Sequence, residues 1–388
     1  MTTRIGRLTS GIAGQHTTGD LLAIRLPLAL VFALPLLAPQ LLPTSRLLSL
    51  AVTAAIYVIA VNGLHIVFSY TGQLSLAHTT LWGLGAYTTA LLIQHYGWAT
   101  PLLFPFAAFA GALGAVVIGI PAFRTGGFSF AIITFAFAEL MRLVANNWRS
   151  LTNGSDGITV IASPTSLGPI SFDTFDHLDN FYYLALGVAY LSVVCVLLIR
   201  QSRLGRTFIA IRENEQLAQS VGINIYLHKL IAFAISGFFA GVAGVFFVYH
   251  QKHIEPGPIS PFGAFFTIQF LLMILIGGRF SVLGPSLGAL VVVFGPEVVN
   301  TVLGDALTPA RTQIIFGSAL AMSVLTAPHG IAGQTREGFR AFVATLRRSR
   351  ERGRSWPVSA IIAFGSGFVP GRVPYRKLDS DGQDRETS

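Results

Sequence analysis

Long apolar runs separated by short polar, glycine-rich or proline-containing breaks repeat along most of this chain. The runs approach the roughly twenty residues that a helix needs to cross a hydrocarbon core ~30 Å thick. The ten-residue alternation typical of membrane barrel strands is not found. The sequence therefore predicts an all-α, polytopic membrane protein with about ten transmembrane helices. The expected spans are 21–42, 47–69, 74–94, 100–121, 127–146, 180–199, 229–249, 262–276, 282–303 and 311–326.

Two places depart from the pattern of a full span. The run 262–276 is short, and Tyr70-Thr71-Gly72-Gln73 interrupts the runs on either side with glycine and polar residues. Irregular backbone at membrane depth is tolerated where it is buried in protein or lines a cavity. Either place is therefore a candidate for a broken or re-entrant helix.

Composition agrees with a membrane protein. The chain has 388 residues, of which 52% are hydrophobic and 11% charged, whereas about a quarter of the residues of a soluble domain are charged. The net charge of +9 is expected to set orientation in the lipid bilayer rather than to bind nucleic acid. The single cysteine, Cys195, excludes a disulfide framework and a thiolate metal cluster, and we expect neither a metal nor a cofactor.

Lysine and arginine gather at 200–229 and in the tail after the last span. By the positive-inside rule both stretches are expected to be cytoplasmic, together with the N-terminus. The loop 147–179 carries Arg149 against four aspartates, which agrees with the outer side. The predicted organisation is a cytoplasmic N-terminal segment at 1–20, a transmembrane domain at 21–326 and a basic, partly disordered cytoplasmic tail at 327–388.

Residues 200–229, called the polar segment from here on, form a charge-rich stretch between apolar runs. Arg212 to Glu215 precede small residues that end at Gly222, which predicts a short helix stopped by a left-handed glycine. Two short helices joined at a glycine would project from the membrane and could fit a groove on another protein. An ordinary solvated loop is the alternative.

Four stretches of the sequence resemble the LivM-type permeases, which are subunits of bacterial branched-chain amino acid ABC importers. They are GQLSLAHTTLWGLGAY at 72–87, RTGGFSFAIITFAFAELMRLVANNW with LTNGSDGI at 124–158, RLGRTFIAIRENEQLAQSVGINIYLHKLIAFAISGFFAGVAG at 203–244 and ISPFGAFFTIQFLLMILIGGRFSVLGPSLGAL at 259–290. They follow the order of the family, and together they cover most of the chain from about 47 to 326.

The resemblance implies that the polar segment is a coupling helix seated in a cleft of a separate ATP-binding subunit. The chain itself has no GxxxxGK[ST] phosphate loop, so the energy must come from a partner. Arg212 and Glu213 can also be read as ordinary exposed charges of little energetic value. The positions that the resemblance implies for the contact are Arg206, Ala210, Arg212, Glu213, Asn214 and Gly222.

The same resemblance implies the remaining partners. They are two ATPase subunits, a second, homologous permease in a heterodimeric membrane core, a periplasmic or extracellular substrate-binding protein, an amino acid substrate and membrane lipid. It also implies that the protein is a multi-pass protein of the bacterial inner membrane.

Polar residues cluster around the interrupted region. Unsatisfied polar groups in hydrocarbon cost several kcal/mol, so such a cluster should face a cavity, another helix or the translocation path. A helix broken at Gly72 would also free backbone groups able to coordinate a zwitterion. Hydrogen bonding between helices is the alternative. The candidate residues of the path are Asn62, Gln73, Ser75 and His78.

Other intramembrane residues have a structural interpretation. Glu139 and Arg142 are one helical turn apart and can pair, which makes them tolerable near the end of a span. Small residues four apart allow close helix packing in lipid. These pairs are Gly237 with Gly241, Ala240 with Gly244, and Gly284 with Gly288.

The function that these observations favour is the permease subunit of an ATP-driven importer for branched-chain or related amino acids. Within the same family, a permease for urea or short-chain amides is the alternative, and the related sugar and nucleoside permeases fit the segment 212–224 less well. An ion-coupled secondary transporter would need carboxylates at mid-membrane, which are nearly absent. No reactive constellation indicates an enzyme.

Overall fold

The computed structural model describes residues 35, 38–41, 44–125, 127–161, 164, 178–257, 263–303 and 317–318. Most of the predicted spans 21–42 and 311–326, and all of the segments 1–20 and 327–388, lie outside these residues. Within them the chain is mostly helical, with one short antiparallel strand pair in which Ile158 lies opposite Ile254.

The elements follow one another in this order: α2 (Ala38–Leu41), α3 (Ser45–His65), the π-helix η2 (Ile66–Tyr70), α4 (His78–Tyr96), α5 (Thr100–Ala122), α6 (Phe128–Asn147), α7 (Arg149–Thr152), the 3-10 helix η3 (Gly154–Asp156), β1 (Ile158–Thr159), α8 (Leu178–Gln201), α9 (Arg203–Glu213), α10 (Glu215–Ser220), α11 (Ile225–Gln251), β2 (His253–Ile254), α12 (Ala264–Gly277) and α13 (Gly284–Leu303).

Five helices of the described part are long and apolar enough to cross a membrane: Ser45–Tyr70, Thr100–Ala122, Phe128–Asn147, Leu178–Gln201 and Ile225–Gln251. The predicted helical, polytopic class is therefore confirmed, and the count of ten is not reached within the described residues. One reason is α12, whose 14 residues extend only ~21 Å along the helix axis. The prediction that the run 262–276 is short is confirmed.

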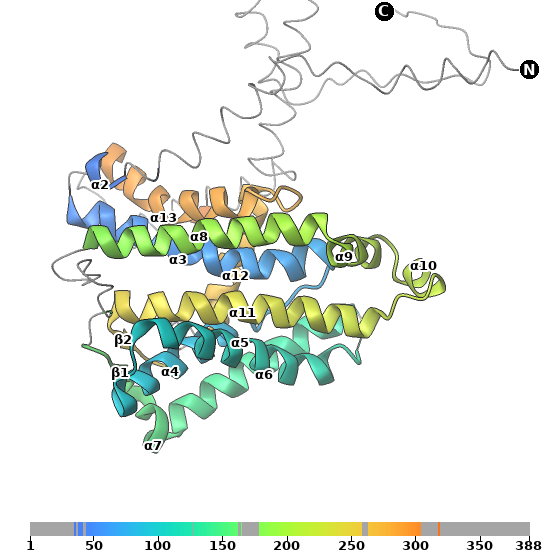
Figure 1. Cartoon of the computed structure of the whole chain (residues 1–388), viewed down its shortest axis with the longest axis horizontal. Helices are drawn as coiled ribbons and strands as arrows, with labels where there is room; N and C mark the ends of the chain where they lie inside the picture. Colours follow the sequence, from blue (N-terminus) through green and yellow to red (C-terminus); the bar gives the residue numbers. More distant parts are fainter. Residues whose placement is uncertain are drawn as a thin grey trace, which may run out of the picture.

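The bundle is built around α11, which packs against α3, α4 and α5 (Figure 1). Helix α3 in turn packs against α8 and α13, and α12 packs against α13. Large side chains such as Trp82, Phe233 and Phe246 are fully buried between these helices. By contrast α6 lies at the margin, with many exposed apolar side chains.

Glycines let α11 approach its neighbours closely. A Cβ atom at Gly241 would overlap the carbonyl oxygen of Ala107 in α5, and one at Gly237 would overlap that of Gly111. On the α4 side, a Cβ at Gly85 would lie 2.5 Å from the Cα of Gly241. The small-residue positions predicted for helix packing therefore lie at backbone contacts, as they must where lipid supplies no hydrophobic drive between helices.

Helices α12 and α13 meet in the same way. A Cβ at Gly288 would overlap the carbonyl oxygen of Met273, and one at Gly277 would overlap that of Gly284. The turn between them contains Gly278 at φ 108°, a conformation that favours glycine. The pair Gly284 and Gly288, predicted for close helix packing, therefore lies at this backbone contact.

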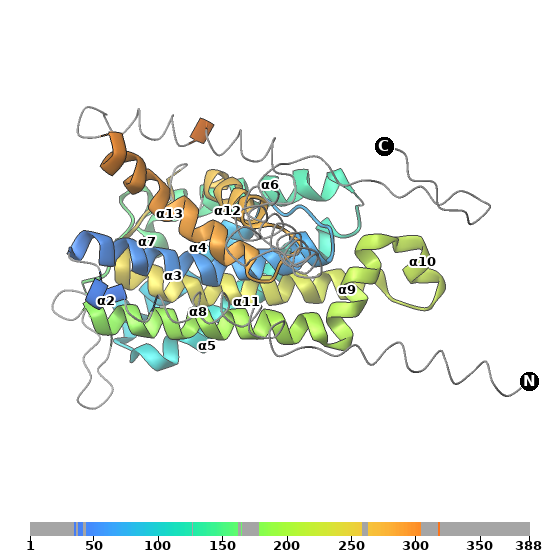
Figure 2. The same cartoon turned by 90° about the horizontal axis from the view of Figure 1, so that it is seen from above.

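The two loops predicted on opposite sides of the membrane lie at opposite ends of the bundle (Figures 1 and 2). Helices α9 and α10 project beyond one end, next to the last turns of α8 and the first of α11. At the other end, α7 and β1 follow α6, and β1 pairs with β2, which follows α11.

Candidate functional site

The helix that begins at Ser45 ends in a π-helix and then breaks. The amides of Thr71 and Gln73 both donate to the carbonyl of Val67 at 3.3 Å, and Gly72 has a φ of 73°. No regular structure follows until α4 begins at His78. The predicted interruption is therefore confirmed. π-Helical turns often occur at functional sites, and residues 66–77 are called the interrupted segment below.

His78 begins α4 inside the bundle. Its Nε2 lies 2.8 Å from the carbonyl oxygen of Ala60, and its Nδ1 lies 3.0 Å from the hydroxyl of Ser236. Because a carbonyl can only accept, Nε2 must carry the proton and donate, while Nδ1 accepts from the serine hydroxyl. His78 thus joins α3, α4 and α11 at a fully buried position.

Two further candidate residues also make contacts within the protein. Asn62 Nδ2 donates to the Ser192 hydroxyl at 2.8 Å, which links α3 to α8. The Ser75 hydroxyl accepts a hydrogen bond from the amide of Ala77 at 3.3 Å. For Asn62 and His78 the structure contains the hydrogen bonds between helices that sequence reasoning offered as the alternative to a substrate path.

Gln73 differs from the other three candidates. The residue is 7% exposed, and its side-chain amide forms no hydrogen bond with another residue in the described part of the chain. Fully buried polar atoms without partners in the described residues include the Oδ1 of Asn62, both ring nitrogens of His65, the Ser69 hydroxyl and the Tyr70 hydroxyl. Sequence reasoning did not select Ser69 and Tyr70, although both are polar and lie two and three residues before Gly72.

The polar segment forms the two short helices α9 and α10, but they do not meet at a glycine as predicted. They meet at Asn214, whose backbone is extended (φ −161°, ψ 109°). Its side chain caps α10 by accepting the amide of Leu217 at 2.9 Å, which stabilises a helix N-terminus. Asn214 therefore ends one helix and starts the next.

Gly222 ends α10 as predicted. It has a φ of 85°; its amide donates to the carbonyl of Gln219 at 3.0 Å, and the amide of Ile223 donates to that of Ala218 at 3.1 Å. These two bonds form a Schellman motif, which satisfies the last carbonyls of a helix.

The candidate coupling residues divide into two groups. Five of them, Arg206, Ala210, Glu213, Asn214 and Gly222, are exposed. Arg212 instead turns back toward the bundle, where its Nη1 donates to the carbonyl of Ser69 at 2.7 Å. Its guanidinium also pairs with Glu213, whose side chain is 66% exposed.

Two apolar residues at the tip of the polar segment were missed by sequence reasoning. Leu217 is 65% exposed and Val221 is 71% exposed, at the end of the protein farthest from the β1–β2 pair (Figure 1). The available signal was the presence of apolar residues in a stretch that is otherwise polar. Exposed apolar side chains that lie together are typical of interaction surfaces.

A polar cleft of about 600 Å³ lies between α10, the start of α11 and the turn after α5. Lys229 is buried beside it and binds Glu215, with 2.7 Å between Nζ and Oε1. This ion pair links α10 to the first turns of α11, which is itself long and apolar enough to span a membrane.

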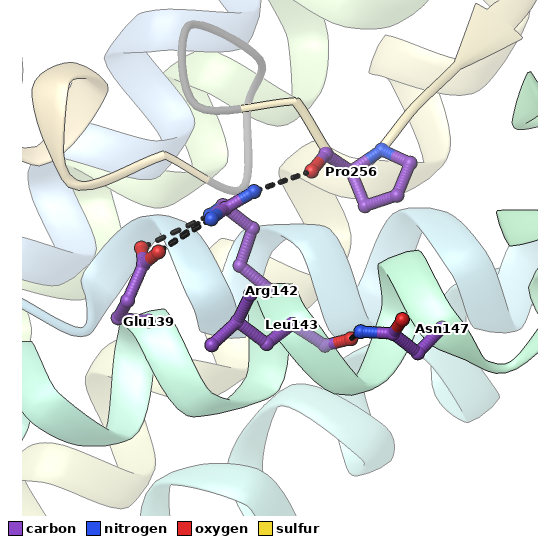
Figure 3. Close-up of polar contacts among 5 residues, drawn as sticks. All are labelled: Glu139, Arg142, Leu143, Asn147 and Pro256. Atoms are coloured by element: carbon purple, nitrogen blue, oxygen red, sulfur yellow. Dashed lines mark hydrogen bonds and ion pairs between the residues drawn. The ribbon is translucent and has the colours of Figure 1, made fainter. Parts of the chain in front are cut away.

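The predicted pair in α6 is also present (Figure 3). Arg142 Nε lies 3.0 Å from each carboxylate oxygen of Glu139, and Nη1 donates to the carbonyl of Pro256 at 3.3 Å. The arginine therefore also joins α6 to the segment after β2.

Comparison with known proteins agrees with this architecture. The model of the family "branched-chain amino acid transport system / permease component" matches residues 46–325. The chain is 28% identical over 306 residues to the high-affinity branched-chain amino acid transport system permease protein LivM of Salmonella typhimurium, covering 74% of this chain and 70% of that protein.

Two further relatives show the breadth of the similarity. LivH of Escherichia coli (strain K12), a permease protein of the same transport system, is 24% identical over 72% of this chain and 91% of its own. The ribose import permease protein RbsC of Haemophilus influenzae is 23% identical over 52% of this chain and 59% of its own. No solved structure matches.

Proposed function

This chain belongs to the family of branched-chain amino acid transport system permease components, and on that premise we propose that it is the permease subunit of an ATP-driven importer for branched-chain or related amino acids. The observation that carries the proposal is the family match, which spans 46–325 and includes both the interrupted segment and the polar segment. The bundle of apolar helices supports a multi-pass protein of the inner membrane.

The polar segment is the proposed contact with the ATPase. The end of the bundle that carries it is then the cytoplasmic end, in agreement with its arginines. Closure of two ATPase subunits must reach the spans as rigid-body motion, and α10 is suited to this because Lys229 and Glu215 fix it to α11. Arg206, Ala210, Glu213, Asn214 and Gly222 are exposed in the polar segment and available for contact.

The proposed assembly contains a second permease, two ATPases and an external substrate-binding protein. Similarity to both LivM and LivH, two permease proteins of one kind of system, supports a core of two related permeases. The absence of a phosphate loop in the sequence supports separate ATPases.

The interrupted segment is the proposed place where the substrate passes this subunit. Helix ends at membrane depth leave backbone donors and acceptors that can coordinate a zwitterion. Gln73 is the favoured side chain, because its side-chain amide forms no hydrogen bond in the described residues, whereas Ser75 and His78 form hydrogen bonds within the protein. Asn62 is bound to Ser192 through Nδ2 only, and its buried Oδ1 has no partner in the described residues.

Reconstitution in liposomes with the ATPases, the second permease and the binding protein tests this function. Uptake of labelled leucine that requires internal ATP is the expected result. Uptake that persists without ATP and follows an ion gradient would contradict it and favour a secondary transporter. If ATP-dependent uptake is inhibited by urea or ribose and not by leucine, valine or isoleucine, the proposed substrate class is wrong. The assignment as an ATP-driven importer would still hold.

Gln73→Leu is expected to slow uptake while leaving the thermal midpoint of the permease near that of the wild type, because the amide has no partner to lose. His78→Leu is expected to lower stability by about 2 kcal/mol, because it removes two buried hydrogen bonds and changes the packing. Thermal unfolding in detergent and initial uptake rates measure the two effects. Wild-type kinetics for Gln73→Leu would remove this residue from the proposed path.

Leu217→Ala is expected to weaken ATPase binding by about tenfold, the loss expected when a residue that carries much of the binding energy is truncated. Alanine preserves the helix, so that only the exposed apolar group is lost. Leu151→Ala, the same substitution at the opposite end of the bundle, is the matched control. Titration of the ATPase against permease in nanodiscs measures the affinity. Equal affinities for the two variants would exclude the tip of α10 from the interface.

A further inference from the structure

Arg212 is the one member of the candidate coupling residues whose side chain points away from solvent. Its side chain is 23% exposed, and its Nη1 donates to the carbonyl of Ser69 at 2.7 Å across 143 positions of sequence. The other five candidate coupling residues are exposed. Arg206, for example, is exposed and donates to the carbonyl of Gln201, at the start of its own segment.

The contact satisfies a carbonyl that the helix break leaves without a helical donor. Ser69 lies in the last turn of the π-helix, where carbonyls have no amide partner further along the helix. A cation at the C-terminal end of a helix is also favoured by the helix dipole. The arginine therefore stabilises the helix end at the point where the regular backbone stops.

The same side chain also contacts a second residue of the interrupted segment and one residue of the α12–α13 turn. A Cβ at Gly72 would lie 3.1 Å from the Cγ of Arg212, so that the aliphatic part of the arginine covers the glycine of the interrupted segment. The guanidinium carbon lies 5.2 Å from the centre of the Phe280 ring, in the turn between α12 and α13, within the range of a cation–π interaction. The interrupted segment and the α12–α13 turn thus meet on one residue of α9.

The turn that Arg212 holds has few other side-chain hydrogen bonds to fix it. The buried hydroxyls of Ser69 and Tyr70 have no partner in the described residues, and neither ring nitrogen of His65 has one. Buried polar atoms without partners are costly, so an alternative arrangement that gave them partners would gain stability. Within the turn the Thr71 hydroxyl donates to the Val67 carbonyl at 2.7 Å, and Arg212 is the side chain that connects the turn to α9.

We infer that Arg212 is a positioning residue that transmits movement of the polar segment to the interrupted segment and to the α12–α13 turn. This inference rests on the proposed function. It changes the role predicted for Arg212 from contact with the ATPase to connection inside the permease. The exposed residues of the polar segment receive the movement, and Arg212 carries it to the helix break beside Gln73.

The test uses Arg212→Gln, with Arg203→Gln as the matched control in an exposed position of the same helix. In the reconstituted complex Arg212→Gln is expected to keep ATPase binding and hydrolysis, while substrate transported per ATP falls about tenfold, the order expected for the loss of a hydrogen bond to a charged group. Arg203→Gln is expected to match the wild type. An unchanged transport-to-hydrolysis ratio in Arg212→Gln would overturn the inference.

Hydrogen exchange on the isolated permease in nanodiscs provides a readout independent of transport. Amides of residues 66–77 are expected to exchange faster in Arg212→Gln than in Arg203→Gln, and equal rates would overturn the inference. If Arg212→Gln fails to accumulate, Arg212→Lys decides, because lysine keeps the charge but lacks the planar fork that serves two partners at once. Faster exchange is expected there, and wild-type exchange would overturn the inference. If the wild-type complex shows no ATP-driven uptake, the proposed function fails, while the exchange experiment still tests Arg212.

Discussion

Gly241→Leu is expected to prevent the permease from accumulating in a folded form. A side chain at this position would overlap the carbonyl oxygen of Ala107 in α5, while Gly85 of α4 packs against the backbone of Gly241 itself. Because α11 has a neighbour on both sides, it cannot move away from one without closing on the other. Overpacking in a core costs about 1–3 kcal/mol when side chains can adjust, and here the obstacle is backbone.

The expected loss therefore exceeds about 3 kcal/mol, a large part of the roughly 5–15 kcal/mol that stabilises a folded protein. Gly187→Leu in α8 is the control, because a Cβ there meets no heavy atom within 4 Å. The amount of monodisperse protein after extraction and its thermal midpoint measure both variants. If Gly241→Leu matched Gly187→Leu, the close packing of α11 against α4 and α5 would be wrong.

Those features that local chemistry determines could be predicted from the sequence. The break at Gly72 follows from a glycine with polar neighbours inside an apolar run, and the end of α10 follows from Gly222. The close packing at Gly237 and Gly241 follows from their spacing of one helical turn. Each of these conclusions requires only residues that are near one another in the chain.

Those features that depend on distant residues could not be predicted. Nothing near Arg212 in the sequence indicates that its partner is the carbonyl of Ser69, because the two meet only when α9 folds against the end of α3. Likewise, nothing near His78 in the sequence indicates that its Nδ1 accepts a hydrogen bond from Ser236 in α11. The junction at Asn214 is different: asparagine is a strong N-cap residue, and the signal was present but was assigned to Gly222 instead.

Arg142→Met is expected to destabilise the permease by up to about 3 kcal/mol, because it leaves the partly exposed carboxylate of Glu139 (41% exposed) without a partner inside a membrane-spanning helix, where an uncompensated charge is costly. Glu139 lies eight residues before α6 ends at Asn147, a distance of ~12 Å along the helix, and a lone carboxylate at that depth in a membrane is unfavourable. The substitution also removes the donor to the Pro256 carbonyl, which loosens α6 from the segment after β2.

The double variant Glu139→Gln with Arg142→Met separates a structural pair from a functional one. Because the neutral amide leaves no charge uncompensated, most of the lost stability should return in the double variant, and thermal unfolding of the two single variants and the double completes the cycle. Uptake that returns together with stability identifies the pair as structural, as the sequence predicted. If stability returns but uptake does not, the two charges act in transport. A double variant as unstable as Arg142→Met alone would contradict the mechanism, since the cost would then come from the lost contact with Pro256 and not from the unpaired carboxylate.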